Sequence, residues 1–176
     1  MELKIENLTR TFQGAEAVSH VSYTMGKGVY GLLGVNGAGK TTLMRMLCTL
    51  LEPTKGTICL NGEDIFRMGA KYRKILGYLP QEFGYYPDFT VKDYLLYIAS
   101  IKGVHRAAAA KRVGELIDQV GLTKVQNRKM KKLSGGMKRR AGIAQAMLNH
   151  PSMLILDEPT AGLDPNERIR FRNLLS

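Results

Sequence analysis

The sequence predicts an α/β fold with a parallel sheet, and three observations carry this prediction. Segments with strand and helix patterns alternate along the 176 residues. Two short apolar runs, Val29–Leu33 and Met153–Leu156, are expected to be buried strands, the first followed by glycines and the second by two carboxylates. A helical insert is predicted between them, at about residues 85–135.

The expected elements follow from local patterns. Residues 1–30 suggest short strands joined by turns, and Asn61-Gly62 is a tight-turn signal after a further strand. Pro80 ends another expected strand. The strands expected besides the two buried runs are Leu3–Glu6, Val18–Met25, Thr57–Leu60 and Ile75–Leu79.

Helices are predicted from apolar periodicity and from residues typical of helix ends. Thr90-Val91-Lys92-Asp93 resembles a capping box, and Asp164-Pro165-Asn166-Glu167 has the residues of a helix start. Glycine or proline follows most of the predicted helices. They cover Thr41–Leu51, the segment from Thr90 to about Gly103, Arg106–Val120, Gly135–Asn149 and the segment after Asp164.

Length and composition favour one domain that works in the cytosol. The chain has ordinary apolar and charged fractions of 44% and 23%, and no apolar run approaches the length of a membrane span. The amino terminus lacks the apolar stretch of a secretory signal. Cys48 and Cys59 show no metal-ligand spacing, so a zinc site is not expected.

The net charge of +11 is concentrated in one part of the chain, because residues 101–150 hold twelve Lys and Arg against two Asp and Glu. A solvated helical face, an attraction to anionic lipid headgroups and nucleic-acid binding are three interpretations of this excess. No aromatic residues interleave the basic stretch to stack on bases, so nucleic acid is not expected as a partner.

A glycine-rich segment matches the phosphate-loop pattern G-x-x-x-x-G-K-[ST]. Glycines allow successive backbone N–H groups to point at phosphate oxygens, and the following helix adds its positive end. Lys40 supplies a charge for the β- and γ-phosphates, Thr41 offers a hydroxyl to Mg²⁺, and Thr42 supports a phosphate contact. The segment reads Gly34-Val35-Asn36-Gly37-Ala38-Gly39-Lys40-Thr41.

Two carboxylates, Asp157 and Glu158, follow the apolar run Met153–Leu156. Open α/β sheets bind ligands at the carboxyl ends of their strands, and Pro159 ends this strand just beyond the pair. Asp157 is therefore expected to hold Mg²⁺ and Glu158 to orient or deprotonate an attacking water. A solvated strand end is the alternative for an isolated acid pair.

A second anion site is predicted at Ser134-Gly135-Gly136, where a hydroxyl cap and two amides open a helix. With the phosphate loop and the acid pair, this segment of LSGGMKRR resembles the signature of the ATP-binding cassette (ABC) family. The resemblance covers essentially the whole chain. It implies a phosphate-loop NTPase core with an amino-terminal antiparallel β-subdomain and a helical signature subdomain at about residues 85–140.

The resemblance also implies a cofactor set, ATP and Mg²⁺, and a head-to-tail dimer. Ser134, Gly135 and Gly136 of one subunit would close over the γ-phosphate held by the other, with Asp164 contacting across the interface. Phe12 would stack on adenine, although a core phenylalanine is an alternative. Gln81 would reach the Mg²⁺ or water. Phe83, Tyr85, Tyr86 and Phe89 look exposed and could line a groove for a membrane subunit or pack locally.

The chain departs from the family pattern in three places. Met137 stands where Gln is usual, and Gly162 stands where many members have Ala. Family members continue to a strand that ends in a histidine near the γ-phosphate, whereas this chain stops at Ser176. Residues 1–176 are therefore expected to form a single, incomplete cassette without that carboxy-terminal region, and to hydrolyse ATP poorly.

The resemblance predicts the ATPase subunit of a bacterial exporter on the inner face of the cell membrane. Its expected partners are a transmembrane permease and a second ATPase subunit, identical or different. The alternatives are a soluble relative that acts on ribosomes or nucleic acid, and an inactive fragment that keeps only the fold.

Overall fold

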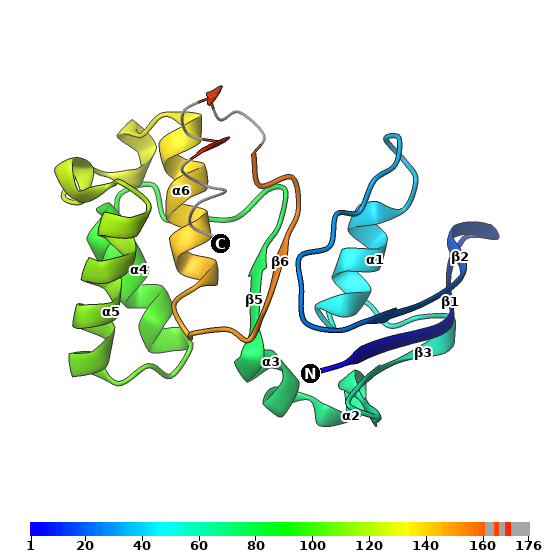
Figure 1. The fold of residues 1–176 in the computed structure, drawn as a ribbon. Coiled ribbons are helices and arrows are strands. Elements are labelled where there is room, and N and C mark those ends of the chain that lie inside the picture. Colours follow the sequence, from blue (N-terminus) through cyan, green and yellow to red (C-terminus); the bar gives the residue numbers. More distant parts are fainter. Residues whose placement is uncertain (161–163, 166–167, 170–176) are drawn as a thin grey trace. The chain divides into compact units, whose positions relative to one another are not determined.

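The structure, a computed structural model, describes residues 1–160, 164, 165, 168 and 169. The chain divides into two compact units, Met1–Lys74 and Ile75–Ser176, and each is described by itself (Figure 1). Among the described residues no helix has the length and apolar character needed to cross a bilayer.

The first unit is built on a four-stranded antiparallel sheet in the order β2-β1-β3-β4. Gln13 and Gly14 both have positive φ, which suits the two-residue hairpin turn between the first two strands. Asn61-Gly62 forms a second such turn, as its sequence predicts. The strands are β1 (Leu3–Phe12), β2 (Ala15–Met25), β3 (Lys55–Leu60) and β4 (Glu63–Asp64).

Three helices belong to this unit: α1 (Lys40–Leu47), α2 (Ile65–Met68) and α3 (Ala70–Ile75). The first ends earlier than its apolar pattern predicts, because Thr49 takes a positive φ of 55° just after it. The fully buried Tyr72 donates its hydroxyl to the Leu47 carbonyl oxygen at 2.7 Å and so links α3 to the end of α1.

The expected strand at Val29–Leu33 does not form. The segment has no regular secondary structure, and Val29 and Leu33 are 88% and 93% exposed. A strand requires a neighbouring strand for its backbone hydrogen bonds, and a run that is apolar on both faces suits the middle of a sheet. The described strands of the first unit leave this run without such a neighbour.

The second unit holds a parallel pair of strands, β5 (Leu76–Leu79) and β6 (Met153–Leu156), paired from Leu76↔Met153 to Leu79↔Leu156. The second strand has the bounds that its apolar run predicts. Because the strands are parallel and in register, the residues after Leu79 and after Leu156 emerge at the same edge (Figure 1). The parallel pair and the antiparallel sheet confirm the predicted α/β class.

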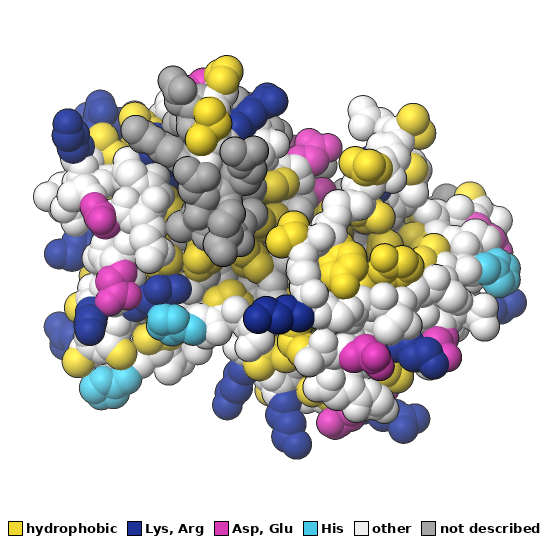
Figure 2. All heavy atoms as spheres, in the orientation of Figure 1, with side chains coloured by type: hydrophobic (Ala, Val, Ile, Leu, Met, Phe, Trp, Pro, Cys, Tyr) yellow, Lys and Arg dark blue, Asp and Glu magenta, His cyan; other side chains and the backbone are white. Residues whose placement is uncertain are grey.

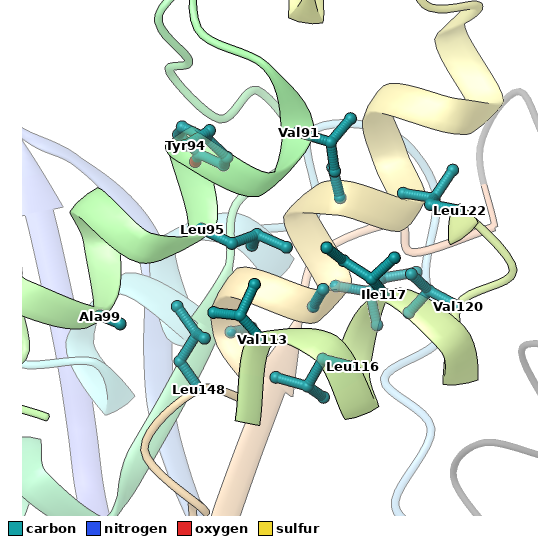
Figure 3. Packing of buried hydrophobic residues seen from close by; sticks show 14 of the residues in the cluster. Val91, Tyr94, Leu95, Ala99, Val113, Leu116, Ile117, Val120, Leu122 and Leu148 are labelled. Carbon is teal, nitrogen blue, oxygen red and sulfur yellow. The ribbon is translucent and has the colours of Figure 1, made fainter. Parts of the chain in front are cut away.

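Three helices pack together in this unit: α4 (Val91–Ile101), α5 (Arg106–Gln119) and α6 (Gly135–Ala146). Apolar side chains from α4 and α5 interlock with others near α6, and Figure 3 shows this packing around Leu95, Val113 and Leu148. The predicted cap of α4 is present, since Thr90 Oγ1 accepts from Asp93 N at 3.1 Å and donates to the Asp93 carboxylate at 2.6 Å.

Two segments distant in sequence pair beside α4. Backbone hydrogen bonds join Val91 N to Arg128 O, Lys92 N to Gln126 O, Met130 N to Phe89 O and Lys131 N to Pro87 O. Thr90 and Lys129 form a β-bridge in the middle of this pairing. Met130 lies in a 3₁₀ turn, η2 (Met130–Lys132), and is buried in the helical core.

Stability is expected to fall as the pH rises from about 10 to 12, and Tyr94 contributes to this. Burial raises the pKa of Tyr94 to about 12, whereas an unfolded tyrosine titrates near ~10. Between these values the unfolded chain releases a proton that the folded chain keeps, so unfolding becomes more favourable. Urea unfolding at several pH values measures the slope. Tyr94→Phe is expected to reduce this slope. Part of the slope should remain in that variant, because burial also raises the pKa of Tyr72.

Candidate functional site

The phosphate-loop sequence connects to α1 in the first unit through two glycines with positive φ, Gly37 at 84° and Gly39 at 81°. Gly39 is the N-cap of α1, and a Cβ there would overlap the Ala17 carbonyl oxygen. Ala38 N donates to the Val35 carbonyl oxygen at 3.2 Å and closes the turn. Gly34, Asn36, Gly37 and Ala38 are exposed, so the loop lies at the surface just before the positive end of α1.

Lys40, the first residue of α1, folds back over this loop. Its Nζ donates to the carbonyl oxygens of Gly34 and Val35 at 2.7 and 2.8 Å. An anion bound in the loop would therefore meet a full positive charge. Thr41 is exposed and Thr42 half-buried in the same helical turn, which leaves the Thr41 hydroxyl accessible to solvent.

We expect Gly39→Ala to destabilise the chain more than Gly37→Ala. Both substitutions place an L side chain at positive φ, which costs about 1–2 kcal/mol. Only the Gly39 methyl also meets a backbone carbonyl, whereas a Cβ at Gly37 has no atom within 4 Å. Chemical denaturation of the two variants provides the matched comparison, and equal losses would contradict the role of the close approach.

Phe12 ends β1 with 43% of its surface exposed. The Arg10 guanidinium lies 4.6 Å from the ring centroid and covers one face of the ring. Arg10 is itself held by a hydrogen bond from Nη1 to the Glu52 carbonyl oxygen at 2.9 Å. The ring is therefore not a core side chain, and adenine stacking stays a prediction for its other face.

In the second unit, the carboxyl ends of β5 and β6 bring Gln81, Asp157 and Glu158 together. Asp157 N donates to the Leu79 carbonyl oxygen at 2.9 Å, and Gln81 Nε2 donates to Glu158 Oε2 at 3.4 Å. Asp157 is only 3% exposed, and its buried Oδ2 has no hydrogen-bond partner in the described part of the chain. A buried carboxylate oxygen without a donor is costly and suits a site for a cation.

The sequence reasoning missed Arg139, which lies at the centre of this arrangement. The side chain is 6% exposed and donates to four backbone carbonyl groups. Nη1 reaches Pro80 O and Gln81 O at 2.8 Å each, and Nη2 reaches Glu158 O at 2.8 Å and also Asp157 O. One guanidinium thus ties α6 to the ends of both strands.

The nearby carboxylates and the helical spacing of α6 both explain why a charged arginine is buried here. Burial lowers the pKa of Arg139, and the nearby Asp157 and Glu158 carboxylates act in the opposite direction, so the group stays a cation. Arg139 falls three residues after Gly136 and four before Ile143, on the buried face of α6. This helical spacing could have indicated that Arg139 is buried, although its neighbours Lys138 and Arg140 make it look like part of an exposed basic segment.

Glu158 has a positive φ of 48°, an uncommon conformation for a residue with a side chain. The hydrogen bond from Arg139 to its carbonyl oxygen and the Pro159 that follows constrain this backbone. Such conformations persist where the surroundings determine them, and they concentrate at functional sites.

The signature residues open α6. Ser134 is the N-cap, and its Oγ accepts from Met137 N at 3.2 Å. Ser134 and Gly135 are exposed and Gly136 is buried. Met137 contributes its backbone N–H to this cap and packs its side chain partly against the helical core. The replacement of the usual Gln therefore leaves the capped helix start intact.

Other predicted residues have mixed outcomes. Asp164 is exposed, and its carbonyl oxygen accepts from Arg168 N at 3.0 Å, while Ala161, Gly162 and Leu163 lie outside the described residues. Of the four aromatics expected to look exposed, Tyr86 is 46% exposed. The prediction is wrong for Phe83, Tyr85 and Phe89, which pack partly against the helical core because the segment folds over α4 and α6.

The first unit carries the phosphate-loop sequence and the second carries the acid pair, and both motifs are typical of phosphate-loop nucleotide-binding proteins. The sequence profile described as ABC transporter matches residues 18–161, and the chain belongs to that family.

Two relatives and one solved structure illustrate the similarity. The Nod factor export ATP-binding protein I of Burkholderia lata is 41% identical over 179 residues, covering 99% of this chain and 59% of that protein. The methionine import ATP-binding protein MetN 3 of Oceanobacillus iheyensis is 38% identical over 182 residues, covering 98% and 53%. The dimeric structure of MJ0796, a bacterial ABC transporter cassette, superposes with a TM-score of 0.88 at 24% identity, covering 98% and 81%.

The chain thus spans between half and three fifths of the length of these two relatives. The structural similarity supports the cassette fold.

Proposed function

We propose that this chain is the ATP-binding subunit of an exporter, and that it binds and hydrolyses Mg·ATP to drive a separate membrane subunit. The observation that carries this proposal is the grouping of Gln81, Asp157 and Glu158 at the ends of β5 and β6, in a chain that also has the phosphate loop. These are the parts that phosphoryl transfer to water requires: a charged cradle, a metal-holding carboxylate and a base.

Glu158 is the proposed base. Its Oε2 accepts a hydrogen bond from Gln81 Nε2 at 3.4 Å, so a water bound to this carboxylate would lie beside the Gln81 amide. The carboxylate would accept a proton from that water as the water oxygen bonds to the γ-phosphorus, while the bond from the γ-phosphorus to the β–γ bridging oxygen breaks and ADP leaves. The strained backbone of Glu158 and the Arg139 bond to its carbonyl oxygen limit the directions in which the carboxylate can point.

The residues fit Mg²⁺. Magnesium prefers hard oxygen ligands, and Asp157 offers a buried carboxylate oxygen without a donor in the described part of the chain. Thr41 would supply a hydroxyl, and Gln81 keeps its amide oxygen free of the bond that its nitrogen makes. When bound, Mg²⁺ would neutralise charge on the β- and γ-phosphates.

Lys40 and the loop amides would bind the phosphates, and Phe12 would stack on adenine with the face that Arg10 leaves uncovered. Ser134, Gly135 and Gly136 would close over the γ-phosphate of a second cassette, with Asp164 near the same interface. The exposed serine and first glycine at the start of α6 support this assignment.

Export is the proposed direction, with this chain on the inner face of the cell membrane, where it would bind a transmembrane permease. The relatives' names include both an export and an import protein. The proposal therefore rests on the signature segment LSGGMKRR and on TVKDYLLYIASIKG, which resemble export ATPases. Co-purification of the chain with a multi-span membrane protein encoded beside it tests the partnership, and cofractionation with ribosomes would contradict it.

Lys40→Ala is expected to weaken Mg·ATP binding by about 100-fold, because a charge-assisted contact to phosphate is lost. Equilibrium binding of a fluorescent ATP analogue measures the affinity. Arg45→Ala is the matched control, since Arg45 is an exposed cation in the last turn of the same helix. Equal affinity of the Lys40→Ala variant and the wild type would overturn the proposed phosphate site.

A further inference from the structure

The basic excess of residues 101–150 is partly gathered on one surface that the nucleotide chemistry does not use. The pairing of residues 87–92 with residues 126–131 brings cations from two distant segments together beside α4. We call this the basic-aromatic surface. Its exposed cations are Lys92, Arg128, Lys129, Lys131 and Lys132, and its aromatic residues are Tyr86, Phe89 and Tyr97.

The pairing separates charged from apolar side chains. Val91 and Met130 are buried, and Phe89 packs partly against the same core. Asp88, Lys129 and Lys131 point to the other side, where both ammonium groups contact one Asp88 carboxylate oxygen, at 3.4 and 2.6 Å. This alternation resembles that of a two-stranded ribbon and places the cations on the solvent side.

The positive charge of this surface is only partly compensated. Its five cations face two neighbouring carboxylates, Asp88 and Asp93. The hydrogen bonds from Lys131 and then Lys129 lower the pKa of Asp88, which keeps that carboxylate ionised, and Asp93 also accepts from the Thr90 hydroxyl at 2.6 Å. A net positive charge therefore remains. Figure 2 shows Lys and Arg side chains around the unit that contains α4 and α5.

An aromatic cluster borders these cations. Tyr86 stacks on Phe89 with centroids 5.0 Å apart, and Tyr97 meets both rings edge to face at 5.1 and 5.6 Å. Tyr86 and Tyr97 are 46% and 38% exposed, and their hydroxyl oxygens lie 3.4 Å apart. The cluster thus offers apolar ring surface with hydroxyl groups at its edge, beside lysines.

We propose that the basic-aromatic surface binds the headgroup region of an anionic phospholipid bilayer. Lysine and arginine are attracted to anionic headgroups, and exposed tyrosines favour the boundary between headgroups and acyl chains. Single-stranded nucleic acid fits less well, because it needs aromatic faces on which bases can stack, and here the rings pack on one another.

The inference rests on the proposed function only in placing the chain beside a membrane. Vesicle binding and Mg·ATP binding are separate measurements. Lys40→Ala is expected to bind vesicles as the wild type does, so failure of the nucleotide site and failure of this surface are distinguishable.

Cosedimentation with vesicles tests the proposal, and it compares pure phosphatidylcholine with phosphatidylcholine that contains about 30% phosphatidylglycerol. We expect anionic vesicles to bind at least about 10-fold more tightly, and we expect the difference to be lost near ~0.5 M salt, where the screening length is about half of its value at physiological salt. The same affinity for neutral and anionic vesicles would overturn the proposal.

Charge variants locate the site. Replacing Lys129, Lys131 and Lys132 together by Gln is expected to lower the affinity for anionic vesicles by about 10-fold or more. The matched control replaces three exposed cations of the first unit, Lys27, Lys55 and Arg67, by Gln, which gives the same change in net charge. An equal loss in both triple variants would mean a non-specific effect of net charge and would contradict the surface.

Asp88→Asn provides a test that misfolding cannot mimic, because the proposal predicts that this variant binds anionic vesicles more tightly than the wild type. Removal of the shared carboxylate leaves Lys129 and Lys131 uncompensated, and affinity for anionic vesicles should rise by about 3-fold. A loss or no change would count against the proposal. So would tighter binding of a single-stranded oligonucleotide that competes with the vesicles, because it would assign the surface to nucleic acid.

Discussion

Arg139→Met is expected to destabilise the second unit by about 3–5 kcal/mol, the largest effect on folding that we predict for a single substitution. The guanidinium donates to the carbonyl oxygens of Pro80, Gln81, Asp157 and Glu158, and methionine would leave these acceptors without their charged donor. Urea unfolding measures the loss.

Two further variants sharpen this test. Arg139→Lys keeps the charge, but a single ammonium group cannot span four carbonyl groups in the planar geometry of a guanidinium, so little rescue is expected. Arg140→Met is the neighbouring control. Arg140 donates to the carbonyl oxygens of Val120 and Gly121, which lie after α5 and not at the ends of the two strands, so a smaller loss is expected. A larger loss for Arg140→Met would contradict the central position of Arg139.

Glu158→Gln is expected to keep Mg·ATP affinity within about 2-fold while single-turnover hydrolysis falls by about 100-fold or more, the range for removal of a general base. Glutamine keeps the shape of the side chain and the ability to accept from Gln81, but it cannot take a proton from water. Quenched reactions with excess protein over labelled ATP separate chemistry from binding.

Glu82→Gln provides a matched control, since Glu82 is an exposed carboxylate next to Gln81. If both variants hydrolysed ATP at the wild-type rate, Glu158 would not be the base. If the wild type bound Mg·ATP without turnover, the proposal would reduce to a nucleotide-binding protein.

Local patterns predicted much of the fold, because they act within a few residues. The bounds of β6, the hydrogen bonds of the Thr90 cap and the Asn61-Gly62 turn follow from neighbouring residues. The Val29–Leu33 segment shows the limit of such reasoning. Its composition suits a strand, but a strand also depends on a partner elsewhere in the chain, which local sequence does not supply.

The candidate site shows the same division. Short local motifs predict Lys40, Asp157 and Glu158 as nucleotide-site residues, and the roles of these residues stay predictions. Arg139 was not identified, since its role depends on four carbonyl groups from two segments that lie far from it in sequence. The basic-aromatic surface likewise arises from a pairing of residues about forty positions apart, which no local pattern predicts.

The Arg139 contacts have a mechanical consequence. The helix that begins at Ser134, the Gln81 backbone and the two acidic residues share one guanidinium, so none of them can shift without pulling on the others. A displacement of the capped end of that helix would therefore be transmitted through Arg139 to the backbone of the two acidic residues. Whatever moves the signature segment must also turn the acidic pair.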